Sequence, residues 1–168
     1  NHFIKKLNTE SRSFMIYHHL NNGLKIPALG TGTNTFGKEK KDFFGEINFD
    51  TKELCSAINL GYRLIDTAIY YRNEAVIGQA VKESKVDRNA VFITTKIPEK
   101  VEFSSTDALV SQHIQQSLQN IDLDYIDLYL MHFPLETNEE NVRVYRILES
   151  FVDQGVIKSI GVSNFNIE

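Results

Sequence analysis

Four side chains that could transfer protons stand out in the sequence by their positions. Asp66, Lys96 and His132 each close an apolar run, and Tyr71 follows Asp66 by five residues. Asp66 and Lys96 would neutralise each other in a half-buried place. The ammonium of Lys96 would then lower the pKa of Tyr71 from its usual value of about 10. With His132 donating to a substrate oxygen, the set predicts proton transfer at a carbonyl group.

Each of these residues also has a purely structural interpretation. An Asp at a strand end often caps a turn, a Lys is often solvated, and a His often serves as a buried hydrogen-bonding group. Tyr71 could pack as an aromatic lid, although its neighbour Tyr70 fits that role better. The matched positions of the acid, the amine and the imidazole favour the catalytic interpretation.

Alternating strands and helices would bring these residues together. The expected strands cover residues 28–33, 62–67, 91–96, 125–132 and 157–163. Between them, apolar residues recur at helical spacing, as in Val110, Ile114, Leu118 and Ile121. This alternation is typical of a parallel sheet with right-handed crossovers, in which chemistry is placed at the carboxyl ends of the strands.

Local signals support this arrangement. Asn21-Asn22-Gly23 lies between two extended runs within residues 14–27, which predicts a tight hairpin. Asp50 with Glu53, and Thr137 with Glu140, have the spacing of capping boxes. Gly61 and Gly155 fall just past two helix ends, where a left-handed residue is favoured. We interpret residues 37–50 as a solvated loop inserted after the first strand of the sheet.

Composition sets the class of protein. The chain has 168 residues, 42% of them hydrophobic, and a net charge of −4. These values predict one globular domain over residues 14–168 behind a flexible tail, residues 1–13. The mild acidity argues against nucleic acid as a partner, and no apolar run is long enough to cross a membrane. A single cysteine, Cys55, forms neither an internal disulfide nor a zinc knuckle, so we expect a cytoplasmic protein without a metal site.

Two glycine-containing runs come close to phosphate-binding motifs. The run from Gly30 has Thr35 where a dinucleotide fingerprint needs its last glycine. The run from Gly32 to Lys38 is followed by Glu39, which offers no hydroxyl to Mg²⁺ and would repel phosphate. Nucleotide hydrolysis is therefore disfavoured.

Two longer segments carry a family resemblance. Residues 61–68, with Glu74 and the Ile77-Gly78 pair, resemble the first signature of the aldo-keto reductases. Leu148 and the segment 158–165 are similar to the second signature. Each signature fixes many positions over a long window, and both occur in the family's order.

The resemblance implies a (β/α)8 TIM barrel with an N-terminal β-hairpin across its bottom. It implies NAD(P)H-dependent reduction of an aldehyde or ketone to an alcohol, with NADP(H) expected and NAD(H) not excluded. Tyr71 would be the proton donor, completed by Asp66, Lys96 and His132. The residues expected near the nicotinamide are Gly32, Thr33, Asn34, Asp66, Ser163 and Asn164.

The length departs from the family pattern. A barrel of this type takes about 250 residues, whereas this chain, which starts at Asn1, holds about five β/α units. We therefore expect an N-terminal fragment of the barrel that is inactive or incomplete alone, or is completed by another chain or a dimer partner, because two parallel edges stay unpaired. The alternatives are a non-catalytic homologue and a flavodoxin-like ligand-binding domain.

Overall fold

The computed structural model describes residues 15–167, so the predicted tail, residues 1–13, lies outside the described residues. The elements in chain order are β1 (Tyr17–His19), β2 (Lys25–Pro27), β3 (Gly30–Gly32), η1 (Glu39–Lys41), α1 (Lys52–Asn59), β4 (Leu64–Asp66), η2 (Ile69–Tyr71), α2 (Glu74–Glu83), η3 (Arg88–Ala90), β5 (Phe92–Ile97), α3 (Val101–Ser104), α4 (Asp107–Ile121), β6 (Ile126–Met131), α5 (Asn138–Asp153) and β7 (Ile157–Val162).

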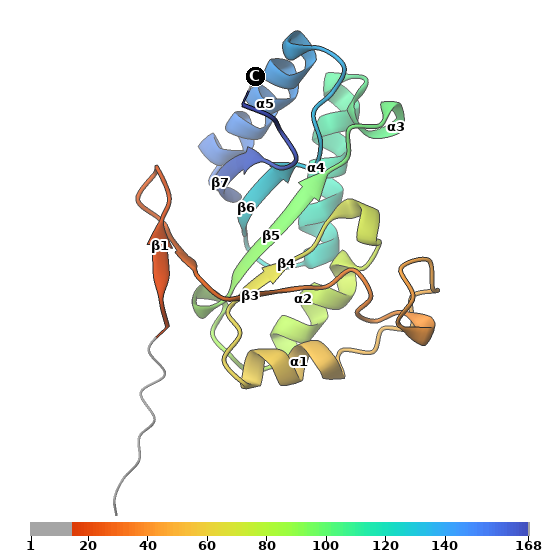
Figure 1. The fold of residues 1–168 in the computed structure, drawn as a ribbon, viewed down its shortest axis with the longest axis vertical. Coiled ribbons are helices and arrows are strands. Elements are labelled where there is room, and N and C mark those ends of the chain that lie inside the picture. The colour runs from red at the N-terminus through yellow and green to blue at the C-terminus, as the bar shows by residue number, and fades with distance from the viewer. Residues whose placement is uncertain (1–14, 168) are drawn as a thin grey trace, which may run out of the picture.

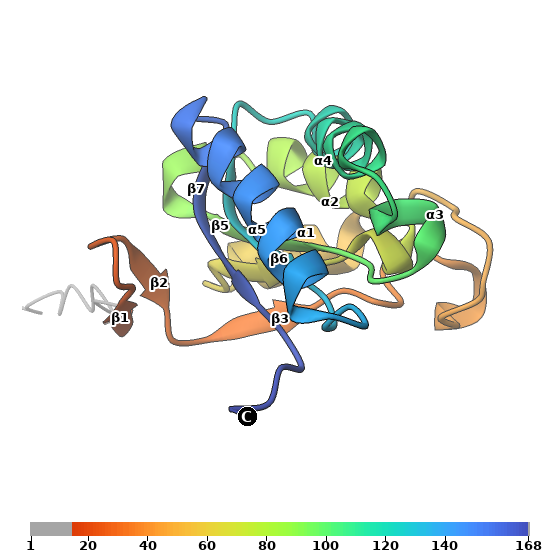
Figure 2. The ribbon, with the colours of Figure 1, turned by 90° about the horizontal axis from the view of Figure 1, so that it is seen from above.

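A five-stranded parallel sheet forms the centre of the molecule (Figure 1). Its order, β3-β4-β5-β6-β7, follows the chain, so each strand pairs with the next one in sequence. Because parallel crossovers are right-handed, a sheet in chain order carries all its connecting helices on one face. Figure 2 shows α1, α2, α4 and α5 on that side. All five strands were predicted. β5 is shifted by one residue toward the C-terminus, and the other four are shorter than predicted at one or both ends.

Helical periodicity accounts for the main core. Val110, Ile114 and Ile121 of α4 are fully buried, as the apolar stripe predicts. Val144 and Leu148 of α5 are fully buried as well. These side chains pack with buried apolar residues of β5 and β6 in one cluster. No helix within residues 15–167 has the length and apolar character that crossing a bilayer requires.

The N-terminal hairpin reaches the far edge of the sheet. β1 and β2 pair antiparallel, with Tyr17 opposite Pro27. Asn22 at the turn donates to the carbonyl of Lys158 at 3.0 Å and to the hydroxyl of Ser159 at 2.7 Å, both on β7. The hairpin is therefore confirmed, and its turn is tight, because the amide of Gly23 donates to the carbonyl of Leu20 at 3.0 Å. Residues 20–24 connect the strands, and only Gly23 among them has a positive φ.

The predicted helix ends are confirmed in part. Thr137 and Glu140 form a capping box, and Gly61 and Gly155 have φ values of 111° and 78°. The capping box expected from Asp50 and Glu53 is absent. Its helix begins one residue later than predicted, after Thr51, and Glu53 instead pairs with Lys41.

The loop over residues 37–50 is less solvated than we predicted. Lys38 is only 3% exposed, because its Nζ donates to the carbonyls of Asn34 and Phe43 at 2.8 and 2.7 Å. The segment also closes on itself through a β-bridge between Lys38 and Ile47.

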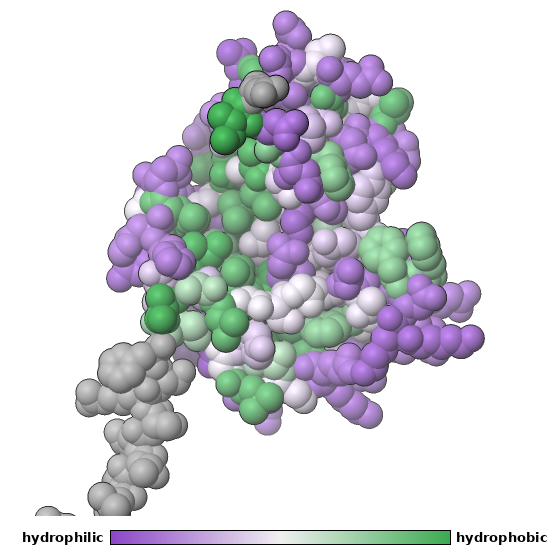
Figure 3. Space-filling view, viewed as in Figure 1, coloured by the Kyte–Doolittle hydropathy of each residue, from purple (hydrophilic) through white to green (hydrophobic). Residues whose placement is uncertain are grey.

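Both edges of the sheet are open among the described residues. β3 and β7 each pair on one side only. Apolar side chains gather over β6 and β7 in Figure 3, and Val162 at the β7 edge is 46% exposed. On the helix side of that edge, Met131, Tyr145, Val162 and Phe165 line an apolar groove.

Candidate functional site

Asp66 and Lys96 form an ion pair at the carboxyl ends of β4 and β5. The Nζ of Lys96 lies 2.6 Å from a carboxylate oxygen of Asp66 and donates to the carbonyl of Thr67 at 2.9 Å. The Lys96 side chain is 7% exposed and that of Asp66 38%. The mutual neutralisation predicted from the sequence is therefore present, and one end of the pair faces the open side of the sheet.

Tyr71 stands above this pair at the end of η2. The Nζ of Lys96 lies 5.3 Å from the centre of its ring. Burial, and then the negative charge of Asp66, raise the pKa of Tyr71 above its usual value of about 10. The predicted lowering of this pKa is wrong, because Asp66 neutralises Lys96 directly and the phenol is half-buried. Tyr71 is therefore protonated at neutral pH.

His132 completes the group from the end of β6. Its ring centre lies 6.1 Å from that of Tyr71, and its ring stacks on Phe133 at 4.8 Å. Burial, and then the charge of Lys96, lower the pKa of His132, so the imidazole is neutral at pH 7. Its Nδ1 is buried without a hydrogen-bond partner among residues 15–167. A neutral ring keeps one N–H that can donate to a substrate oxygen.

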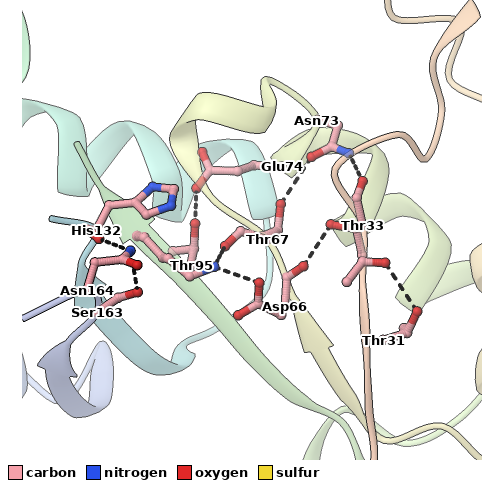
Figure 4. Close-up of polar contacts among 12 residues, drawn as sticks. Thr31, Thr33, Asp66, Thr67, Asn73, Glu74, Thr95, His132, Ser163 and Asn164 are labelled. Carbon is pink, nitrogen blue, oxygen red and sulfur yellow. Dashed lines mark hydrogen bonds and ion pairs between the residues drawn. The ribbon is translucent and has the colours of Figure 1, made fainter. Parts of the chain in front are cut away.

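Of the residues expected around the nicotinamide, Thr33, Asp66, Ser163 and Asn164 lie along the same rim (Figure 4). At the β3 end, the hydroxyl of Thr33 donates to the carbonyl of Asp66 at 2.9 Å, and Gly32 leaves open space beside it. At the β7 end, Asn164 has a φ of 60° and its amide donates to the carbonyl of His132 at 2.8 Å and to the hydroxyl of Ser163 at 3.0 Å.

These contacts leave acceptor atoms available for a ligand. One oxygen of Asp66 is bonded to Lys96, and its side chain is partly exposed. The bonds of Asn164 to His132 and Ser163 both use its amide nitrogen, so neither of them occupies its amide oxygen. Asn34 is exposed, and within residues 15–167 only its carbonyl accepts a hydrogen bond, from Lys38. Donors such as ribose hydroxyls and a carboxamide therefore fit this rim.

A buried polar network behind the site was missed by the sequence reasoning. Asn73 is fully buried and donates to the carbonyl of Thr33 at 2.6 Å, while its oxygen accepts from Thr67 at 3.1 Å. Next to it, Glu74 accepts from Thr95 at 2.6 Å. Burial raises the pKa of Glu74. The network fixes the ends of β3, β4 and β5 relative to α2. The sequence signal that could have revealed it is the polar pair Asn73-Glu74 at the start of an otherwise apolar helix.

A parallel sheet with helices on one face and polar residues at its strand ends defines the class of β/α-barrel proteins. The profile of the aldo/keto reductase family matches residues 28–168. The chain belongs to that family. It is 37% identical over 147 residues to morphine 6-dehydrogenase of Pseudomonas putida, a match that covers 88% of this chain and 46% of that protein. It is 42% identical over 111 residues to methylglyoxal reductase of Yersinia pestis, covering 66% of this chain and 38% of the relative.

Solved structures agree with the family assignment. An aldo/keto reductase of Brucella melitensis superposes with a TM-score of 0.78 at 31% identity, covering 90% of this chain and 53% of the other. An aldo-keto reductase of Bombyx mori in complex with NADP gives 0.76 at 33% identity, covering 90% and 51%. The chain thus spans about half the length of the proteins it matches. Its fold is that of the (β/α)8 barrel, present here over five strands. The flavodoxin-like alternative is wrong, because the sheet order follows the chain without a reversal.

Proposed function

We propose that this chain carries the catalytic part of an NAD(P)H-dependent reductase that converts an aldehyde or ketone to an alcohol. Tyr71 donates the proton, while Asp66, Lys96 and His132 position it and the substrate. The observation that carries the proposal is the convergence of these four side chains at one rim, centred on the 2.6 Å pair of Lys96 and Asp66. The cofactor, when bound, supplies the hydride.

The protonation states support this direction of reaction. A general acid must hold its proton until the substrate oxygen becomes basic. Burial and Asp66 raise the pKa of Tyr71, so the phenol stays protonated at neutral pH. The neutral imidazole of His132 donates to the same oxygen and orients it toward Tyr71, without adding a charge of its own.

Gly32, Thr33, Asn34, Asp66, Ser163 and Asn164 would hold the nicotinamide end of the cofactor. Asp66 and Asn164 offer the acceptors described above. The Bombyx mori relative was solved with NADP, which supports NADP(H) as the cofactor; NAD(H) is the other choice. A single cysteine supports the cytoplasm as the place of action.

We further propose that the open edges of this half-barrel are covered in the active form, by further β/α units, by another chain or by a second copy. The unpaired edges of β3 and β7 and the apolar groove beside Val162 support this. Titration of the isolated 168-residue chain with NADPH, followed by nicotinamide fluorescence, tests it. We expect no saturable binding by the monomer, and micromolar binding would contradict the need for completion.

Replacement of Tyr71 tests the catalytic proposal. In the natural polypeptide that carries these residues, Tyr71→Phe should lower kcat for aldehyde reduction by about 10²–10⁴-fold, because the proton donor is lost and the ring is kept. Tyr70→Phe is the matched control, since the Tyr70 hydroxyl bonds Glu99 and not the ion pair. Unchanged reduction by Tyr71→Phe would favour the non-catalytic homologue.

A further inference from the structure

The loop between β3 and α1 forms a rigid wall beside Tyr71. In addition to the β-bridge between Lys38 and Ile47, the amide of Glu39 donates to the carbonyl of Glu46 at 2.9 Å. The amide of Asn48 donates to the carbonyl of Gly37 at 2.8 Å. A loop closed by its own backbone in this way holds its tip, residues 42–45, in one place.

Two cations fix the tip at Phe43. The carbonyl of Phe43 accepts from Lys38 Nζ at 2.7 Å and from Arg72, the residue after Tyr71, at 2.9 Å. Arg72 also donates to the carbonyl of Gly45 at 3.3 Å. The ammonium of Lys38 lies 4.6 Å from the centre of the Phe43 ring. One clamp therefore comes from the loop itself and the other from the segment that carries Tyr71.

The clamp places the Phe43 ring against the proton donor. The rings of Phe43 and Tyr71 meet edge to face with centres 6.1 Å apart. Phe44 continues the row at 5.1 Å from Phe43 and is 82% exposed. Beyond Tyr71 the row continues through His132 to Phe133. The two charges near Phe43 are directed at backbone carbonyls, so the surface offered beside Tyr71 is aromatic.

We propose that Phe43 is a specificity-determining residue that binds the non-reacting part of the substrate, and that it selects carbonyl compounds bearing an aromatic ring. This inference rests on the proposed function. In this proposal the carbonyl oxygen lies within hydrogen-bond reach of the Tyr71 hydroxyl, and its substituent lies beside the Tyr71 ring on the side of Phe43. Phe43 lies along that ring, where an aromatic substituent gains edge or stacking contacts that a short alkyl chain does not make.

The test compares two substrates in the natural polypeptide. Phe43→Ala should lower kcat/KM for phenylacetaldehyde by about fivefold to tenfold, as expected for one lost aromatic contact, and change that for propanal by less than about twofold. The control is Phe49→Ala in the same loop, whose ring is 60% exposed; it should leave both values unchanged. Phe43→Tyr keeps the ring and should retain the preference.

Several outcomes would overturn the inference. One is an equal loss for both substrates in Phe43→Ala, which would indicate a role in loop stability only. Another is a wild-type preference for glyoxylate over phenylacetaldehyde, which would indicate that the exposed guanidinium of Arg72 binds an anionic substrate. Retention of the phenylacetaldehyde preference in Phe43→Ala would also contradict it.

A binding measurement separates this inference from the proposed function. Saturation-transfer NMR with benzyl alcohol, in the presence of NADP, reports contact with the aromatic ring without turnover. We expect transfer in wild type and Phe49→Ala and its loss in Phe43→Ala. If wild type reduces no aldehyde and this pattern still holds, the reductase proposal fails and the aromatic site stands. If transfer is equal in all three proteins, the aromatic site fails.

Discussion

Two cation–carboxylate pairs of nearly equal length lie at opposite ends of the same parallel sheet. Arg88 and Asp127 are 2.7 Å apart at the amino ends of β5 and β6. Lys96 and Asp66 are 2.6 Å apart at the carboxyl ends of β5 and β4. In β/α barrels the amino end of the strands serves stability and the carboxyl end serves chemistry. The two ion pairs differ in their surroundings in a way that fits these two roles.

The Arg88–Asp127 pair is almost fully bonded. Arg88 also donates to the carbonyls of Val91 and Tyr125 at 2.6 and 2.7 Å and lies 4.0 Å from the centre of the Tyr125 ring. Asp127 accepts from the amide of Ile93 at 2.8 Å. Of the guanidinium, only Nε is buried without a partner among residues 15–167. Such a pair has little capacity left for a ligand.

In the Lys96–Asp66 pair the additional hydrogen bond is on the lysine side, where Lys96 also donates to the carbonyl of Thr67. Asp66 is partly exposed, the Tyr71 ring stands over Lys96, and the His132 ring lies next to that of Tyr71. The buried Nδ1 of His132 has no partner within residues 15–167. The two pairs therefore differ in unused hydrogen-bonding capacity and not in the presence of buried charge. We call the carboxyl end, where we propose the chemistry, the reactive end of this sheet.

Removing the cation at the reactive end should have the largest effect, and on activity. Lys96→Met in the natural polypeptide leaves Asp66 uncompensated beside Tyr71, so we expect kcat for aldehyde reduction to fall by about 10²–10³-fold. The free energy of unfolding should change by no more than about 1–2 kcal/mol, because Asp66 can be hydrated. Steady-state kinetics and urea denaturation check the two values. A large loss of stability with intact kcat would reverse the roles assigned to the two ends.

Removing the cation at the other end should have the opposite pattern. Arg88→Met leaves the carboxylate of Asp127 buried and unpaired, and we expect the free energy of unfolding to fall by about 3 kcal/mol. Values of kcat for the folded fraction should stay within about twofold of wild type, since Arg88 lies at the far end of the sheet. Urea denaturation of the 168-residue chain measures the change in the free energy of unfolding. An Arg88→Met protein as stable as wild type would show that the dense bonding around this pair adds nothing.

The sequence predicted the reactive end better than the stabilising end. Polar residues that close apolar runs stand out, so Asp66, Lys96 and His132 could be placed at one rim before their contacts were known. Arg88 falls in a polar segment, where a charged residue has no such contrast. Asp127 does interrupt the apolar strand 125–132, but it lies near the start of that strand and so is not among the polar residues that close apolar runs. Their other partners are backbone groups, which no residue pattern predicts: two carbonyls for Arg88 and the amide of Ile93 for Asp127.

The remaining errors came from tertiary contacts that a sequence does not display. The charge of Lys96 was expected to act on Tyr71, but its effect depends on the direct bond to Asp66. The charged run after Gly37 suggested a solvated loop, whereas two backbone carbonyls bury Lys38. In both cases the residue type was read correctly and its partner was unknown.

The smallest expected effect is a pH dependence of stability whose sign differs between the two ends. The pKa of His132 is lowered in the folded chain by burial and by Lys96. As pH falls from above about 6.5 through that folded value, the unfolded chain binds more protons, so stability is lost. Burial raises the pKa of Asp127 despite Arg88. Its contribution is fully present below about pH 3.9 and is lost as pH rises through the folded pKa.

Urea denaturation of wild type, His132→Asn and Asp127→Asn between about pH 7.5 and pH 3.5 separates the two signs. From about pH 7.5 to pH 5.5, wild type should lose more stability than His132→Asn, because the variant has no imidazole to protonate. Toward acid pH, the stability of wild type relative to Asp127→Asn should rise, because the buried carboxyl becomes neutral. Parallel curves for all three proteins would mean that neither end is tuned by burial. A wild-type curve that steepens against Asp127→Asn on acidification would show that the bonds to Arg88 and Ile93 outweigh the burial of Asp127.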